Sequence, residues 1–143
     1  MDPSEHRALW ERRQAELWDR IFQVTQDVAH LSDTIEDSSG GSVMKQGLVN
    51  AAMNVGKHVV RATAAESGHD FTKHLDEARM QAIEADYWLR LTYIIQQQEG
   101  VQRDVSNIIA QYASIIDLLK KMVSHVERQH DASAHMERPK ISL

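Results

Sequence analysis

Two histidines of this chain follow a glutamate at a fixed spacing, and these four side chains are the ones best suited to chemistry. Glu66 and His69 form one Glu-x-x-His pair, and Glu127 and His130 form another. Di-iron helical bundles carry this spacing on two helices, because residues three apart lie on the same helical face. Imidazole also suits zinc, copper and nickel. The pattern therefore makes Glu66, His69, Glu127 and His130 candidate ligands for a divalent metal.

The alternative is a solvated, histidine-rich end of a helical bundle that holds no metal. Gly68 interrupts the first pair, and neither pair falls in the middle of an apolar stripe. The chain also offers His6, His74 and His125 near the same expected end. Metal binding is therefore the third-ranked hypothesis for this chain.

A second chemical possibility is a basic strip on one predicted helix. Lys45, Lys57, His58 and Arg61 follow one another there and are the candidate nucleic-acid contacts. Phosphate binding relies on clustered Lys and Arg and on counterion release. The net charge of −5 and a pI near 5.9 argue against nonspecific binding to nucleic acid. Interleaved acids favour a solvated face instead.

Signatures of other chemistries are missing from the sequence. It contains no cysteine, which excludes disulfides, thiolate metal sites and a cysteine nucleophile. It also lacks a nucleophile elbow, a phosphate-binding glycine loop, a zincin motif and a calcium loop. We therefore expect no enzymatic activity and no cofactor. The charged start predicts that the chain has no signal peptide, and the absence of a long apolar run predicts that it does not cross a membrane.

Helical periodicity dominates the elements that would carry these residues. Apolar residues recur every three or four positions in four stretches, approximately residues 4–36, 43–66, 71–98 and 104–128. Short connections between long helices predict an all-α, antiparallel up-down-up-down four-helix bundle over residues 1–130. The loss of periodicity beyond it predicts a flexible tail over residues 131–143. Gly47 and Gly56 predict that a neighbouring helix approaches closely.

Further apolar residues flank the main stripes. Such a second line either widens the core or forms a contact between subunits, because large exposed apolar patches are unusual on monomers. Both alternatives stay open at this point. The candidate interface residues are Trp88, Leu91, Ile95, Ile109, Ile116 and Val123.

The middle of the chain resembles the bacterial four-helix bundle protein family, first met in proteins encoded by intervening sequences of 23S ribosomal RNA genes. The family pattern has a helix of small residues, then A-x-S-x-x-D-F, then A-x-x-E-A-x-E-x-x-Y-W-L. The matching residues are those from Asn54 to Val59, then Ala65, Ser67, Asp70 and Phe71, then Ala78, Gln81, Ala82, Glu84, Tyr87, Trp88 and Leu89.

This resemblance implies a cytosolic protein, often a homopentamer around an axis, without an established biochemical activity. The retroelement accessory variability determinant is similar in fold and binds nucleic acid as a basic protein. The present chain departs from the family at polar positions: His58 replaces an asparagine, and Arg61 and Gln81 replace glutamates. An ion pair between Arg61 and Glu84 is a reasonable replacement.

Together these patterns predict a non-enzymatic bundle that assembles into a ring-like homo-oligomer and presents surfaces to an unknown protein partner. The alternative is an accessory factor that binds RNA or DNA. The second alternative is a bundle that binds a divalent metal.

Overall fold

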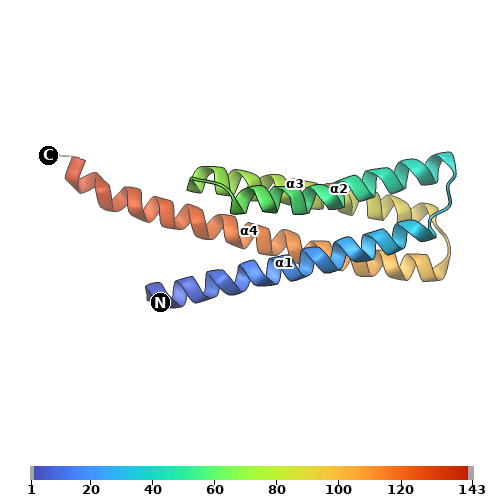
Figure 1. The fold of residues 1–143 in the computed structure, drawn as a ribbon, viewed down its shortest axis with the longest axis horizontal. Helices are drawn as coiled ribbons and strands as arrows, with labels where there is room; N and C mark the ends of the chain where they lie inside the picture. Colours follow the sequence, from blue (N-terminus) through green and yellow to red (C-terminus); the bar gives the residue numbers. More distant parts are fainter. Residues whose placement is uncertain (1, 142–143) are drawn as a thin grey trace.

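The protein is an all-α four-helix bundle. The computed structural model describes the backbone of residues 2–141 and the side chains of residues 2–5 and 7–129. Its helices are α1 (Pro3–Thr34), α2 (Ser39–Thr63), α3 (Gly68–Ile95) and α4 (Glu99–Ile141), and the backbone from residue 2 to 141 forms no strand. Successive helices run in opposite directions, and each one packs against two others (Figure 1). The predicted fold class is therefore confirmed.

One stripe from each helix fills the core, as the apolar spacing predicts. Ile21 of α1 is 2% exposed and Ile115 of α4 is fully buried. Three alanines of α3 allow its neighbours to pack closely around them. The predicted stripe residues that are buried are Leu17, Ile21, Val24, Val28, Leu31 and Ile35 of α1, Met44, Leu48, Ala52, Val55, Val59 and Ala62 of α2, Leu75, Ala78, Ala82, Ala85 and Leu89 of α3, and Val105, Ile108, Tyr112, Ile115, Leu119 and Met122 of α4.

A capping box formed by Asp2 and Glu5 begins α1. The Asp2 carboxylate accepts a hydrogen bond from the backbone N–H of Glu5 at 2.8 Å, and the Glu5 carboxylate accepts one from the N–H of Asp2 at 3.0 Å. Pro3 occupies the first turn, where no intrahelical N–H donor is needed. This capping box satisfies backbone donors that would otherwise lack partners at the helix start.

Three glycines that fall outside the stretches indicated by apolar periodicity lie inside helices. Gly40 falls in the first turn of α2, Gly68 opens α3, and Gly100 falls in the first turn of α4. Serine caps explain the first two, because the Ser38 hydroxyl accepts from the N–H of Gly41 and the Ser67 hydroxyl from the N–H of Asp70. The helices therefore begin several residues earlier than apolar periodicity alone indicates.

The division into a bundle over residues 1–130 and a tail over residues 131–143 stays a prediction. The backbone of α4 stays helical to Ile141, past the stretch of residues 104–128 that apolar periodicity indicates. In Figure 1 this end of α4 projects past the hairpin of α2 and α3. The flexibility of the C-terminal segment stays a prediction. None of the described helices is both long and apolar enough to span a bilayer.

Candidate functional site on the outer side of α2 and α3

Polar side chains join α2 and α3 along one seam. Asn54 Nδ2 donates a hydrogen bond to Gln81 Oε1 at 3.4 Å, and one turn further His58 Nδ1 lies 3.0 Å from Glu77 Oε2. Because the helices are antiparallel, four residues forward on α2 correspond to four residues backward on α3. The register between these helices therefore decides which chemical groups meet.

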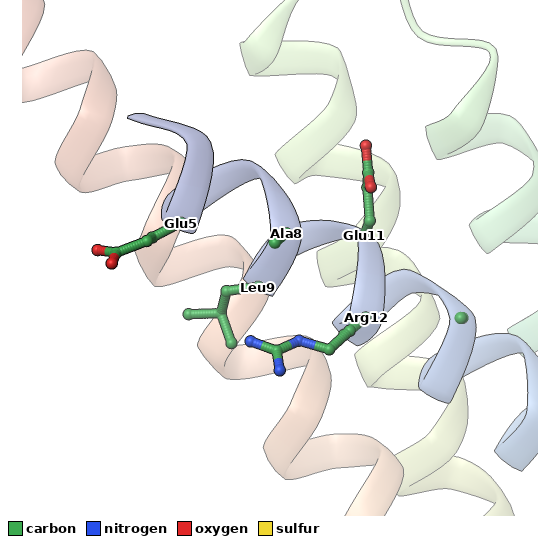
Figure 2. Close-up of a pocket in the computed structure, with 6 residues that line it drawn as sticks. Glu5, Ala8, Leu9, Glu11 and Arg12 are labelled. Atoms are coloured by element: carbon green, nitrogen blue, oxygen red, sulfur yellow. The ribbon is translucent and has the colours of Figure 1, made fainter. Parts of the chain in front are cut away.

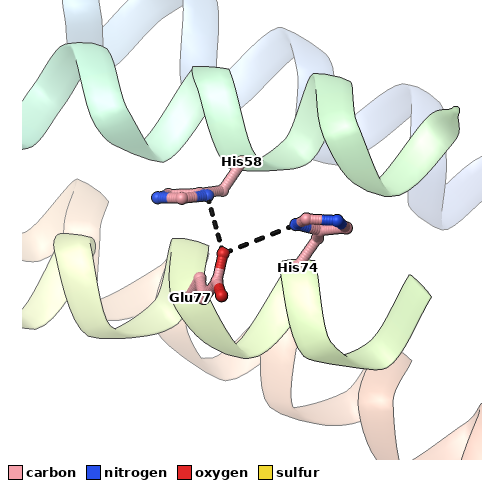
Figure 3. Close-up of side chains that lie close together, drawn as sticks. All are labelled: His58, His74 and Glu77. Atoms are coloured by element: carbon pink, nitrogen blue, oxygen red, sulfur yellow. Dashed lines mark ion pairs between the residues drawn. The ribbon is translucent and has the colours of Figure 1, made fainter. Parts of the chain in front are cut away.

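His58, His74 and Glu77 form a compact cluster at this seam. His74 Nδ1 lies 3.4 Å from the same Glu77 Oε2 that His58 approaches. The two imidazole rings are nearly parallel, with centroids 6.5 Å apart and an interplanar angle of 19°. Figure 3 shows His58 reaching from α2 toward the Glu77 carboxylate, which His74 approaches along α3. We call these three residues the His–Glu–His cluster.

The electrostatics of the cluster favour neutral imidazole at His58. Burial lowers the pKa of His58, the nearby Arg61 and Lys57 charges lower it further, and Glu77 opposes the shift. The Nδ1 atoms of His58 and His74 are buried, and neither forms an aligned hydrogen bond despite the short distances to Glu77. Two imidazole nitrogens and a carboxylate oxygen thus lie close together without an aligned hydrogen bond between them.

An open cleft of about 610 Å³ lies beside the cluster and contains part of the predicted metal set. His58 and Glu77 line this cleft together with His69 and Glu127. Glu66 lines a different cleft, near Trp10. The side chain of His130 lies outside the described residues. Among the described side chains, the three ligand atoms that lie within 4.8 Å of one another belong to His58, His74 and Glu77.

The four residues predicted to contact nucleic acid lie in different surroundings. Lys45 Nζ lies 2.6 Å from the Asp37 carboxylate, and the lysine charge lowers the pKa of Asp37. Lys57 and Arg61 are exposed, whereas His58 faces Glu77. Nucleic-acid binding stays a prediction.

The suggested Arg61–Glu84 ion pair is absent from the described side chains. The observed register explains this, because Asn54 already faces Gln81 and Arg61 lies almost two turns further along α2. Arg61 therefore lies beside the first half of α3, whereas Glu84 lies on the other side of Gln81. The sequence alone does not contain the offset between the helices that separates these two residues.

The predicted interface residues lie partly inside the monomer. Val123 belongs to the core, and Trp88, Ile109 and Ile116 pack against it. Leu91 is half-buried, and Ile95 is 52% exposed. The second apolar line therefore contributes to a broad core, and a subunit contact through these residues stays a prediction.

A different apolar stripe is exposed on α3, and its residues are not among the predicted interface residues. Met80, Ile83, Tyr87 and Ile94 are 55%, 40%, 58% and 70% exposed. Their spacing of three, four and seven residues places them on one helical face, opposite the buried alanines. The signal is present in the sequence as a second heptad-like repeat on the same helix. We call these four residues the α3 stripe.

The cleft beside the start of α1 does not bring titratable side chains from different helices together. It has a volume of about 740 Å³, and the residues that line it, Glu5 to Ala15, all belong to this one helix. In Figure 2 the carboxylates of Glu5 and Glu11 point in different directions. The α2–α3 side is therefore the better candidate for a functional site.

Comparison with known proteins supports the fold. No family model and no curated protein matches the sequence. A solved structure of a protein of unknown function from the S23 ribosomal protein family of Bacteroides thetaiotaomicron VPI-5482 is similar, with a TM-score of 0.71 and 20% identity. The match covers 78% of this chain and 98% of that one. At this identity the likeness shows a shared four-helix fold and carries no residue roles.

Proposed function

We propose that this protein is a non-enzymatic interaction module that assembles with copies of itself through the α3 stripe. This proposal rests mainly on one observation: α3 is well packed on its inner face but exposes Met80, Ile83, Tyr87 and Ile94 on its outer face. Contact between water and exposed apolar side chains is unfavourable by roughly 25 cal/mol per Å². A partner helix that covers this stripe recovers that free energy.

A second copy of the chain suits the stripe because of its spacing. Apolar residues at heptad spacing pack against a helix that carries the same repeat, as knobs of one helix enter holes of the other. The α3 stripe supplies that repeat on both sides of a contact between copies. In an isologous contact both copies use the same surface, so the α3 stripe of each copy is sufficient.

The charges around the stripe are complementary under self-pairing. Asp76 and Arg90 lie seven residues before and after Ile83 on the same helix face. Both are exposed, and within the chain each forms an ion pair along α3, with Arg79 and Asp86 respectively. When two α3 helices meet antiparallel and centred on Ile83, Asp76 of each copy faces Arg90 of the other. A parallel arrangement would instead bring like charges together, which is unfavourable.

Family resemblance supports self-assembly by an independent route. The motifs around Ser67 and Tyr87 resemble a family whose members often form pentameric rings, and the similar solved fold carries an S23 family name. Antiparallel pairing of α3 gives two-fold contacts, whereas a ring uses two different surfaces. The copy number distinguishes these two arrangements.

Light scattering coupled to size-exclusion chromatography tests the proposal. The unmodified chain should elute as a multimer of its 16.3 kDa mass. Ile83→Glu introduces a charge into the centre of the α3 stripe and should reduce the mass to that of one chain. Phe22→Glu is the matched control, because Phe22 is a 65% exposed aromatic residue on α1.

The control should leave the mass unchanged, and circular dichroism should show that both variants keep their helices. A monomeric unmodified chain at micromolar concentration would refute self-assembly. An unchanged mass for Ile83→Glu would place the contact away from the α3 stripe and would also contradict the proposal.

A further inference from the structure

We infer that His58, His74 and Glu77 form a binding site for a divalent transition metal, with zinc as the best-suited ion. This site differs from the set predicted by the Glu-x-x-His spacing, and it goes beyond the proposed self-assembly. Two imidazole nitrogens and one carboxylate oxygen are a common zinc donor set. The three ligand atoms lie within 4.8 Å of one another.

The two distances from the histidine nitrogens to Glu77 are close to those between ligands of a tetrahedral ion. With metal–ligand bonds of about 2.0–2.2 Å, the ligand atoms of a tetrahedral zinc site stand roughly 3.3 Å apart. The Nδ1 atoms of His58 and His74 lie 3.0 Å and 3.4 Å from Glu77 Oε2. An ion can therefore enter between these atoms with small rotations of the side chains.

The two histidine nitrogens of the cluster lack aligned hydrogen bonds, which favours binding of an ion. Both Nδ1 atoms are buried and lack an aligned hydrogen bond. Buried polar atoms without an aligned hydrogen bond cost free energy, and one Glu77 oxygen faces both nitrogens. A cation between the two nitrogens and the carboxylate oxygen would satisfy all three atoms at once.

The helices hold the ligands in place before an ion arrives. His74 and Glu77 lie three residues apart on α3, so their side chains share one face of the helix. His58 comes from α2, whose backbone is fixed against α3 by the buried core. A bound ion would therefore link two helices, and it would raise the stability of the fold by mass action.

Access to the site comes from the neighbouring cleft. His58 and Glu77 line the cleft of about 610 Å³, which also contains His69, Asp76 and Glu127. Three protein ligands leave one position of a tetrahedral ion open. That position would face the cleft and would hold water or a small anionic ligand.

The alternative is a structural contact in which Glu77 neutralises one or both histidines. Such an ion pair would hold α2 and α3 in register without binding any metal. Both models place the same side chains together, but only the metal site predicts stoichiometric uptake of zinc. The two models therefore differ in a measurable way.

Calorimetric titration of chelator-treated, tag-free protein with zinc chloride tests the inference. We expect one zinc ion per chain, and a melting temperature that rises with zinc concentration. His58→Gln and Glu77→Gln each remove one ligand and should weaken zinc binding at least tenfold. Cobalt offers a second readout, because four-coordinate cobalt absorbs visible light strongly.

Two matched controls separate this site from other histidines. His30→Gln changes an exposed histidine of α1, and His69→Gln changes a histidine in the same cleft outside the cluster. Both variants should bind zinc as the unmodified chain does, and circular dichroism should confirm that every variant is folded. Absence of zinc binding to the unmodified chain would refute the site.

The site is also refuted if folded His58→Gln binds zinc with unchanged affinity. Loss of binding in His69→Gln, with binding retained in His58→Gln, would move the metal to the set predicted from sequence and would equally overturn the inference. Failure of self-assembly leaves these outcomes unaffected, because they are read per chain.

Discussion

At the residue scale, Tyr112 is the largest fully buried side chain that the structure describes. Its ring is fully buried in α4, and its hydroxyl has no hydrogen-bond partner among the described residues. Burial raises the pKa of Tyr112 well above its ordinary value, so the phenol stays protonated. A buried hydroxyl without a partner costs free energy, whereas the aromatic ring stabilises the core.

Tyr112→Phe should therefore stabilise the protein. The substitution keeps the ring and removes the unpaired hydroxyl, so we expect the free energy of unfolding to rise by about 1 kcal/mol. Urea denaturation of both proteins measures the change. Tyr93→Phe is the control, because Tyr93 is 41% exposed and should show no measurable effect. A decrease in stability for Tyr112→Phe would show that the hydroxyl makes a favourable contact in the folded protein.

The structure assigns His58 a different role from the one that the sequence suggests. In the sequence it belongs to a basic strip with Lys45, Lys57 and Arg61. In the structure its ring turns toward Glu77 across the helix pair, and its pKa is lowered by burial. The residue therefore serves the His–Glu–His cluster better than it serves an anionic ligand such as nucleic acid.

At the scale of elements, two glycines of α2 play different roles. A Cβ atom on Gly47 would collide with the ring of Trp88, so this glycine allows α3 to approach α2. This confirms the close approach that the sequence predicts at Gly47. A Cβ atom on Gly56 would lie 3.7 Å from Ile21 Cγ2, which is an ordinary contact distance. The prediction was therefore wrong for Gly56, because the space beside it accepts a methyl group.

Alanine substitutions at these glycines should have opposite effects. Gly47→Ala forces Trp88 to move and should destabilise the fold by about 1–3 kcal/mol. Gly56→Ala lowers the backbone entropy of the unfolded chain at a helical position and should stabilise the fold by up to about 1 kcal/mol. Chemical denaturation of the two variants beside the unmodified chain measures both effects. Equal stability for Gly47→Ala and the unmodified chain would contradict the close packing of Trp88.

Helix boundaries were the least predictable part of the elements. Apolar periodicity starts only where a helix reaches the core, whereas Ser38 and Ser67 begin α2 and α3 on exposed residues. Their hydroxyl groups replace missing backbone partners at the helix start. Local capping chemistry therefore extends each helix beyond the apolar stripe.

At the scale of the whole molecule, the two proposals use different surfaces of the same helix pair. Met80 belongs to the α3 stripe and also lines the cleft beside the His–Glu–His cluster, so the surfaces meet at this residue. Ile83 does not line the cleft among the described residues. The cluster takes all three of its ligands from one chain.

Self-assembly and zinc binding should therefore be separable. We expect Ile83→Glu to lose its multimeric mass while it binds zinc with unchanged affinity. His58→Gln should show the reverse, with normal mass and weakened zinc binding. Light scattering and calorimetry on the same preparations measure both properties. A parallel loss of zinc affinity in Ile83→Glu would mean that a second copy contributes a ligand.

The amino-acid sequence by itself determined the fold class and most of the core. Apolar residues that recur every three or four positions can leave water only when four helices pack together, so Ile21 and Ile115 had to be buried. The tertiary structure decided which polar groups meet. Periodicity leaves the axial offset between two helices undetermined, and that offset brings His58 to Glu77 and keeps Arg61 away from Glu84. The exposure of the α3 stripe depends on the packing in the same way, because only the packed bundle shows that no other described helix of the chain covers it.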